Sequence, residues 1–484
     1  MIVYAVDLGT TNVKVVRYDE AARAEATATR PMRYHREGDR VTFDPDAVVD
    51  AVLDLIRSAG REAPDGDSSA SIVITGQAES LVLVDVDGQV LGPGISWMDE
   101  RSGEQAREMA TAFDPDEAFA ITGEPEPVPT WPATKLRWLT QQHPEVLPRV
   151  RHVFMIKDFV IWRLTGRAVG EETTRGFTYL YDVPGRDYWA DMMDFCGVTR
   201  AMLPEVVPAG TTVGPVLPSI SERLPAAAYT VNAGALDHFC AMLGTDTYAP
   251  GELSVSAGTV LALSLLTEDW KHDPTSRVSF HAGLRPGDTV LFSCADSGGV
   301  SLGWFQEILG GGGAPGTGEP DLRAVDRGAA PLFLPYLTGL NPPDFNPRAR
   351  GAFLDLQLRH DRGDMVYSVM EGVAHLLRRN LEDLAAHGQP AASMTSAGGG
   401  TASDVWNQLK ADVTGLELTV PREPQDACRG AAVLALAAGG AIDSLHDTAL
   451  LSRPPVTTYR PRADPLTDQR YAAFDAALHR LYAP

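Results

Sequence analysis

One local pattern occurs twice in the chain, and it restricts the possible folds more than any other feature. Near the start, the β-rich runs Val3–Val6 and Val13–Tyr18 flank a turn that contains Gly9, as in a β-hairpin. A second strand, glycine turn and strand surround Gly258, 249 positions after Gly9. Repetition of the unit at this distance indicates two related lobes that face one another.

The length of the chain agrees with such a division. Its 484 residues exceed what one hydrophobic core usually supports. Helical patterns such as residues 46–58 and 131–142 lie between the strands. We therefore expect an α/β protein whose first lobe covers residues 1–246 and whose second lobe covers residues 247–484.

The charge of the chain narrows the classes of partner. Asp and Glu number 64 against 41 Lys and Arg, a net charge of -23, which argues against a nucleic-acid or anionic-membrane binder. The start has no basic run followed by an apolar stretch, and the small-residue run Gly430–Ala441 is too short to span a bilayer. The four cysteines lie far apart and form no CxxC pair, which argues against both a disulfide scaffold and a zinc knuckle. We expect a cytoplasmic protein.

The first glycine turn carries groups suited to phosphate and magnesium. Glycine at the bend lets backbone N–H groups and hydroxyls approach phosphate oxygens closely. Lys14 lies beyond the bend and could add a positive charge, and Asp7 at the strand end suits a hydrated magnesium ion. Taken alone, a tight turn without any ligand explains these residues equally well.

Two later turns are similar in character. Ser256–Thr259 is the counterpart of the first turn, and Gly398–Gly400 precedes a helical pattern that starts at Ser403. A nucleotide can lie on the backbone of a glycine-rich turn, and a helix N-terminus favours its negative charge. A helix cap or a crowded packing turn is the alternative for Gly398–Gly400.

Six short segments along the chain carry a further signal through their order. They are Asp7–Thr11, Ile74–Ser80 with Trp97–Ser102, Thr130–Leu139, Ala235–His238, Gly398–Gly415 and Arg429–Ala432. In this order they resemble the FGGY carbohydrate kinases, whose fold is the two-lobed actin-like, ribonuclease H-like ATPase fold with a central cleft. The resemblance runs from about Tyr4 to about Gly440 and departs at Thr130, where the family usually has an aromatic residue, Gly or Ser.

The resemblance implies ATP-dependent phosphorylation of a hydroxyl on a small sugar or polyol, with Mg²⁺ as the metal. It implies that Asp237 is the base that takes the hydroxyl proton and that Asp7 holds the hydrated magnesium. From its neighbours alone, Asp237 could merely cap the following helix. The residues expected around the nucleotide are Thr10, Thr11, Asn12, Lys14, Gly258, Thr259, Gly299, Gly399 and Gly400.

The resemblance also implies where the sugar binds. The expected substrate residues are Gln77, Ala78, Glu79, Trp97, Asp99, Asp237 and His238. The glycerol kinase branch has an arginine at the position of Ala78, followed by the glutamate that is retained here as Glu79. Loss of the arginine argues against glycerol and enlarges the pocket, which suits a longer polyol or a ketose. We predict a ketopentose kinase similar to xylulose kinases.

Several alternatives stay open on the sequence. The substrate could be another polyol or ketose, such as erythritol, a pentitol or a ketohexose. Two other classes of protein are an actin-type ATPase that acts on a protein partner and a catalytically idle relative that binds sugar. Trp97 could belong to the core, His238 could be satisfied within the hinge, and Asp99 with Arg101 could form a structural ion pair. We expect Lys135 at the surface or paired locally. Family members are often dimers, so a homodimer is one state we consider.

Overall fold

The computed structural model forms two compact units. The residues that it describes are 1–60, 69–225, 227–257, 260–267, 271–295, 297–308, 325–337, 339, 346, 348–422, 426–445, 451–453 and 455–482. Unit 1 consists of Met1–Asp246, Ser279–Val290 and Gln425–Arg453. Unit 2 consists of Thr247–Val278, Leu291–Pro424 and Pro454–Pro484. None of the helices among the described residues is both long enough and apolar enough to cross a membrane.

The first change of unit falls after Asp246, and unit 1 also takes in two later segments. One contains helix α13 (Asp426–Ala438), which packs against strands β1 and β6 of unit 1. The other contains β18 (Ser279–Ala282), where Phe280 N donates a hydrogen bond to the carbonyl of Gly123 at 2.9 Å. Tertiary contacts made far along the chain therefore define the unit, not a single cut in the sequence.

The central sheet of unit 1 has the strand order β14-β15-β6-β1-β2-β3. Its strands are β1 (Ile2–Leu8), β2 (Asn12–Tyr18), β3 (Ala24–Pro31), β6 (Ser69–Gly76), β14 (Thr212–Pro215) and β15 (Ala228–Asn232). Strand β1 is antiparallel to β2 and parallel to β6, which confirms the hairpin predicted around Gly9.

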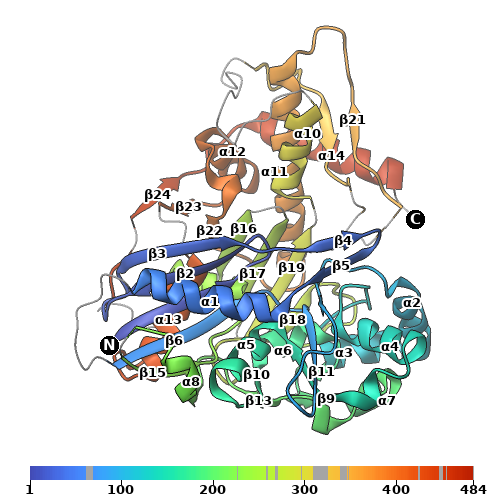
Figure 1. The fold of residues 1–484 in the computed structure, drawn as a ribbon. Helices are drawn as coiled ribbons and strands as arrows, with labels where there is room; N and C mark the ends of the chain where they lie inside the picture. Colours follow the sequence, from blue (N-terminus) through green and yellow to red (C-terminus); the bar gives the residue numbers. More distant parts are fainter. Residues whose placement is uncertain are drawn as a thin grey trace. The chain divides into compact units, whose positions relative to one another are not determined.

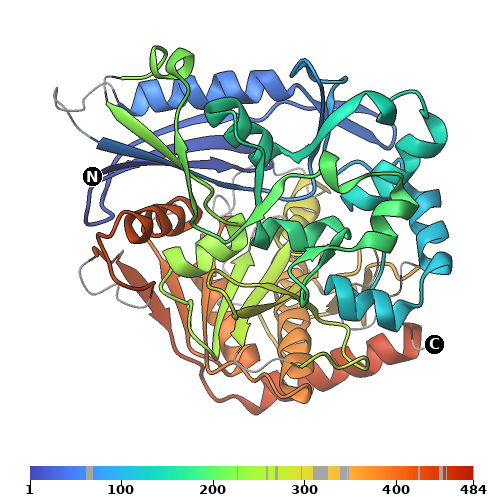
Figure 2. The ribbon, with the colours of Figure 1, turned by 90° about the horizontal axis from the view of Figure 1, so that it is seen from below.

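Both faces of this sheet are covered, which explains why β1 and β6 are buried along almost their whole length. Helix α1 (Pro45–Ala59) packs against β2 and β3, and α13 packs against β1 and β6. Figure 2 shows these two helices on opposite faces of the sheet. Helix α1 starts where the sequence provides an N-cap, since Asp44 accepts hydrogen bonds from the N–H groups of Asp46 and Ala47.

A second sheet and several helices complete unit 1. The sheet has the order β4-β5-β8-β7-β9. Its strands are β4 (His35–Glu37), β5 (Arg40–Phe43), β7 (Leu81–Asp85), β8 (Gly94–Ile95) and β9 (Val150–Met155). The helices are α2 (Gly103–Ala112), α3 (Pro115–Thr122), α4 (Pro132–Gln142), α5 (Ile156–Thr165), α6 (Glu172–Arg175), α7 (Ala190–Cys196), α8 (Pro218–Ser221) and α9 (Asp237–Gly244). Short strands are β10 (Val169–Glu171), β11 (Tyr181–Asp182), β12 (Asp187–Tyr188) and β13 (Glu205–Val207).

Unit 2 repeats the strand arrangement of unit 1 (Figure 1). Its sheet contains β19 (Thr289–Ala295), β17 (Leu261–Thr267), β16 (Glu252–Ala257), β22 (Ser393–Ala397), β23 (Leu418–Pro421) and β24 (Val456–Tyr459), in that order. Strand β16 is antiparallel to β17 and parallel to β22, as β1 is to β2 and β6. This common pairing is the structural basis of the repeat seen in the sequence.

Helices and one small strand pair complete unit 2. They are α10 (Gly299–Ile308), α11 (Arg362–Ala386), α12 (Asp404–Thr414), α14 (Pro465–Tyr482), β20 (Leu332–Leu334) and β21 (Ala352–Leu354). Helix α11 begins with a reciprocal capping box between Asp361 and Asp364, and Ser403 caps α12. A core cluster that includes Leu302, Val369 and Trp406 joins α10, α11 and α12.

Candidate active site

Asp7 lies near the end of β1, within the central sheet of unit 1. The strand register places it opposite Lys14 on β2 and opposite Thr75 on β6. Its Oδ1 atom is buried and has no hydrogen-bond partner. Burial, with a smaller contribution from the charge of Asp237, raises the pKa of Asp7 to about 7, and the charge of Lys14 opposes this shift. The strand thus presents a carboxylate oxygen that is available to a ligand.

The predicted phosphate turn connects β1 to β2. Position 9 favours glycine, since a Cβ there would lie 3.0 Å from the carbonyl oxygen of Asn12, a tight contact. Thr11 is exposed at the turn. Thr10 Oγ1 accepts a hydrogen bond from the indole Nε1 of Trp97 at 3.0 Å. The turn is therefore tied to the segment in which the sugar site is expected.

Asp237 is the first residue of α9, and Leu236 before it occupies the cap position without a side-chain cap bond. The simple capping role considered from the sequence does not match this arrangement. Asp237 Oδ1 accepts a hydrogen bond from the N–H of His238 at 2.7 Å, and both side chains are partly exposed. The charge of Asp237 contributes to the raised pKa values of Asp7 and Glu79. Three predicted site carboxylates thus share one neighbourhood.

Glu79 follows β6 in a backbone conformation that only glycine adopts easily, with φ of +66°. Strained non-glycine residues of this kind are concentrated at functional sites. Burial raises the pKa of Glu79 to about 7; the charge of Lys135 and a hydrogen bond with Thr130 oppose the shift, and the charges of Glu124 and Asp237 add to it. The pKa of Glu79 is therefore raised well above the ordinary value of a glutamate carboxyl.

Lys135 is fully buried, so of the two positions expected for it, at the surface or paired locally, the surface position is wrong. Its Nζ donates hydrogen bonds to the carbonyls of Ser96 at 2.8 Å and Thr130 at 2.6 Å. Burial lowers the pKa of Lys135 to about 8, while the charges of Glu79 and Asp99 act in the opposite direction. Carbonyls and carboxylates from separate segments compensate the buried ammonium.

Gln77 and Ala78 belong to the segment expected to bind the sugar, and Gln77 connects this segment to the phosphate turn. Gln77 is buried, and its Nε2 donates to the carbonyl of Gly9 and to Tyr34 Oη, both at 3.4 Å. Ser80 Oγ donates to Gln77 Oε1 at 2.9 Å and accepts from the backbone N of Trp97 at 3.1 Å. Ala78 is buried, whereas Trp97 is only partly buried. These contacts hold the two expected subsites together.

Asp99 forms the structural ion pair that was the alternative to a substrate contact. It is fully buried, and its two oxygens lie 2.7 and 2.6 Å from Nε and Nη2 of Arg101. Oδ2 also accepts a hydrogen bond from Val41 N at 2.6 Å, and the Arg101 guanidinium stacks over the ring of Trp138. A direct contact of Asp99 with substrate stays a prediction, and it would require this arrangement to open.

The residues expected around the nucleoside lie in unit 2. Gly299 is the first residue of α10, and Gly399 and Gly400 belong to a short 3₁₀ turn, Gly399–Thr401, before α12. Lys410 Nζ donates a hydrogen bond to the carbonyl of Gly400 at 3.1 Å. The predicted partners Gly258 and Thr259 lie outside the described residues.

Comparison with known proteins identifies the family. Residues 2–244 match the N-terminal domain, and residues 314–439 the C-terminal domain, of the FGGY family of carbohydrate kinases. The chain belongs to the FGGY family. It is therefore an ATP-dependent carbohydrate kinase, a phosphotransferase with an alcohol group as acceptor.

Several carbohydrate kinases are similar in sequence to this chain over nearly its full length. A xylulose kinase of Escherichia coli is 29% identical, over 99% of this chain and 98% of its own length. A gluconokinase of Bacillus subtilis is 25% identical, over 91% of this chain and 88% of its own length. The crystal structure of a xylulose kinase from Lactobacillus acidophilus superposes with a TM-score of 0.91 at 23% identity, covering 100% of this chain and 98% of that one. The FGGY chain thus has the two-domain actin-like ATPase fold.

Sequence reasoning missed several residues of this FGGY chain that surround the candidate site. They are Thr75, Glu124, Lys157, Glu171 and Thr173. Each is buried, and all of them except Thr75, which belongs to the motif segment Ile74–Ser80, lie outside the motif segments. The sequence contains a weak signal for Lys157. In the run from Val153 to Val160 it is the one cation, and every other residue except Asp158 is apolar. Only the fold brings these side chains behind the motif residues.

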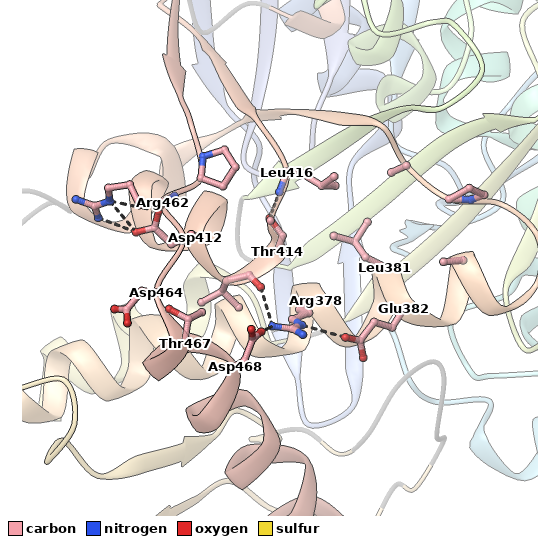
Figure 3. Close-up of a pocket in the computed structure, with 17 residues that line it drawn as sticks. Arg378, Leu381, Glu382, Asp412, Thr414, Leu416, Arg462, Asp464, Thr467 and Asp468 are labelled. Atoms are coloured by element: carbon pink, nitrogen blue, oxygen red, sulfur yellow. Dashed lines mark hydrogen bonds and ion pairs between the residues drawn. The ribbon is translucent and has the colours of Figure 1, made fainter.

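Unit 2 of this FGGY chain also contains a pocket of about 520 Å³. Figure 3 shows that Arg378 and Arg462 each pair with carboxylates of the pocket. Arg378 binds Glu382 at 2.9 Å and Asp468 at 2.7 Å, and Arg462 binds Asp412 at 2.6 Å. None of the predicted site residues lines this pocket, and we assign it no role in the reaction.

Proposed function

We propose that this FGGY kinase transfers the γ-phosphoryl group of ATP to a hydroxyl of a ketopentose such as xylulose, with Asp237 as the general base. One observation supports the proposal: burial raises the pKa of both Asp7 and Glu79, and the charge of Asp237 adds a smaller contribution to each. Asp7 belongs to the expected phosphate side, and Glu79 belongs to the expected sugar side. These contributions support a position of Asp237 near both reactants, as the base of this reaction requires.

In the proposed reaction, the carboxylate of Asp237 accepts the proton of the attacking hydroxyl. That oxygen forms a bond to the γ-phosphorus, and the bond from this phosphorus to the β–γ bridging oxygen breaks, which releases ADP. Glu79 accepts hydrogen bonds from other sugar hydroxyls. Thr10, Thr11, Asn12 and Lys14 offer hydroxyl, amide and ammonium groups to the phosphates.

Asp7 is the residue proposed to hold magnesium. Among the described residues no group of three or more His, Cys, Asp or Glu side chains could hold a metal, but Mg²⁺ keeps several waters and needs only one or two carboxylates besides the phosphates. The buried Oδ1 of Asp7, without a partner, fits this requirement. When bound, the ion neutralises charge on the phosphates.

The electrostatics of the expected sugar site support a neutral substrate over gluconate. Glu79 interacts electrostatically there with both Glu124 and Asp237, and carboxylates disfavour an anionic ligand. Lys135, the nearby cation, is fully buried and already donates to two carbonyls. Both xylulose kinases and gluconokinases occur among the relatives, so this difference in charge supports the former.

A panel of substrates tests the proposal. We expect sugar-dependent ADP release to be fastest for a ketopentose when ketopentoses, ketohexoses, tetritols, pentitols, glycerol and gluconate are compared at equal concentration. A higher kcat/KM for gluconate or glycerol would contradict the assignment. ADP release that no sugar stimulates would instead favour the alternative of an ATPase acting on a protein partner.

Substitution of the base tests the role of Asp237. We expect Asp237→Asn to lower kcat by about 10²- to 10⁴-fold, because an amide cannot accept the hydroxyl proton. Asp191→Asn is the control, since Asp191 is exposed on α7. If Asp237→Asn retained sugar-dependent ADP release within a few-fold of wild type, Asp237 would not be the base.

The cytoplasmic location and the homodimer stay predictions. Light scattering on the purified protein tests the second: a mass near twice the chain mass of 52.0 kDa is the result expected for a dimer.

A further inference from the structure

We propose that Lys157, Glu171 and Thr173 are positioning residues that hold the loop directly before Asp237. The loop comprises residues 233–236 and connects β15 to α9. The inference rests on the proposed role of Asp237. It assigns a function to a buried polar cluster that none of the family motifs contains.

Lys157 anchors the start of the loop from α5. Its Nζ donates to Glu171 Oε1 at 2.7 Å and to the carbonyl of Ala233 at 3.0 Å. Lys157 and Glu171 are both fully buried. Burying two charges costs solvation free energy, and a well-packed apolar pair is often equally stable. A role in fixing the geometry of the loop explains the pair better than stability alone.

Thr173 anchors the end of the loop. Its hydroxyl donates to Glu171, with Oγ1 2.8 Å from Oε2, and the same Oγ1 accepts a hydrogen bond from Leu236 N at 2.8 Å. The hydroxyl has one hydrogen, and it forms the hydrogen bond to the Glu171 carboxylate. The oxygen lone pair is therefore the acceptor for Leu236 N, the residue directly before Asp237.

The rest of the loop is bonded in the same manner. Thr75 Oγ1 donates to the carbonyl of Ala235 at 2.8 Å, and Asn232 Oδ1 accepts from Gly234 N at 2.8 Å. Each residue from 233 to 236 thus has a backbone group bonded to a side chain. Since Thr75 also lies opposite Asp7 in the β1–β6 register, the same bonds link the position of the base to that of Asp7.

The test compares two neighbouring threonines. Thr173→Val removes the bond to Leu236 N, whereas Thr174→Val removes only a hydroxyl that donates to the carbonyl of Glu171 at 3.0 Å. Both threonines are fully buried. We expect Thr173→Val to lower kcat about 10- to 100-fold with both KM values within about three-fold, because small displacements of a reacting group cost this much. Thr174→Val should stay within about two-fold, and Thr173→Ser should restore most of the rate.

A double substitution separates positioning from general damage. In the Asp237→Asn background there is no base to position, so adding Thr173→Val should change the residual rate by less than about two-fold. Equal losses in Thr173→Val and Thr174→Val, or the same extra loss in the Asp237→Asn background, would overturn the inference.

The outcomes also distinguish this inference from the proposed function. A wild-type protein without sugar-dependent ADP release would refute the proposed function itself. An active wild type with an inactive Asp237→Asn and a fully active Thr173→Val would refute only the positioning role. If circular dichroism shows that Thr173→Val does not fold, Thr75→Val, which removes the bond to Ala235, takes its place with the same expected fall in kcat at unchanged KM.

Discussion

At the scale of single residues, the site contains carboxylates that are held at a cost to stability. Asp7 is the clearest example, because burial raises its pKa to about 7 and its Oδ1 lacks a partner. A raised pKa means that the folded protein binds a proton more tightly than the unfolded chain does. The stabilising contribution is complete below the unfolded pKa near 4 and is lost as the pH rises through 7.

We therefore predict that Asp7→Asn stabilises the protein at pH 8.5. Without magnesium or nucleotide, the free energy of unfolding should rise by about 1–3 kcal/mol, after allowance for partial solvent screening. At pH 5 the gain should be much smaller, because wild-type Asp7 is then protonated in the folded state. Urea unfolding in EDTA measures both values, with Asp191→Asn as the control. A loss of stability at pH 8.5, or a gain independent of pH, would contradict this account.

Residue identity in the motifs could be predicted, but side-chain environment could not. The order of short segments indicated Asp7, Glu79 and Asp237 as one site, and the raised pKa values of the first two agree with their proximity to the third. The burial of Lys135 was missed. One of its hydrogen-bond acceptors is the nearby carbonyl of Thr130, but the other is the carbonyl of Ser96, 39 residues away. No local pattern around a lysine indicates that such a distant carbonyl will meet it.

At the scale of elements, the position of α9 depends on a close contact with α13. A Cβ at Gly430 would lie 1.7 Å from the carbonyl oxygen of Cys240, and a Cβ at Gly244 would lie 1.8 Å from that of Asp426. The two glycines let the helix backbones meet directly. Since α9 begins with Asp237 and α13 also packs on β1, this contact joins the strand of Asp7 to the helix of the base.

We predict that Gly430→Ala lowers the free energy of unfolding by about 3 kcal/mol or more, because the backbones must separate to admit the methyl group. It should also lower kcat, since α9 moves. Gly303→Ala is the matched control within α10, where a Cβ would meet no atom within 4 Å. There alanine should be neutral or stabilising by up to about 1 kcal/mol. Thermal and urea unfolding measure both, and equal effects at the two glycines would argue against the close contact.

At the scale of the whole molecule, the net charge of -23 is the dominant property of the surface. Self-repulsion of this size destabilises a compact state, and salt screens it. We predict that the melting temperature at pH 8 rises by several degrees between 10 and 300 mM NaCl, at concentrations where the Debye length falls to about 6 Å. At pH 5, close to the isoelectric point near 4.8, the rise should nearly disappear. An equal rise at both pH values would exclude screening as the cause.

The sequence by itself determined the family, the strand–turn–strand repeat and the residues of the motifs, because these depend on short segments whose chemistry is local. Tertiary structure alone decided that residues 279–290 and 425–453 join the first unit. It alone decided that Lys157, Glu171 and Thr173 gather behind the loop of Asp237. The physical reason is that a buried charge is tolerated only where partners meet it in space, and spacing along the chain does not encode that meeting.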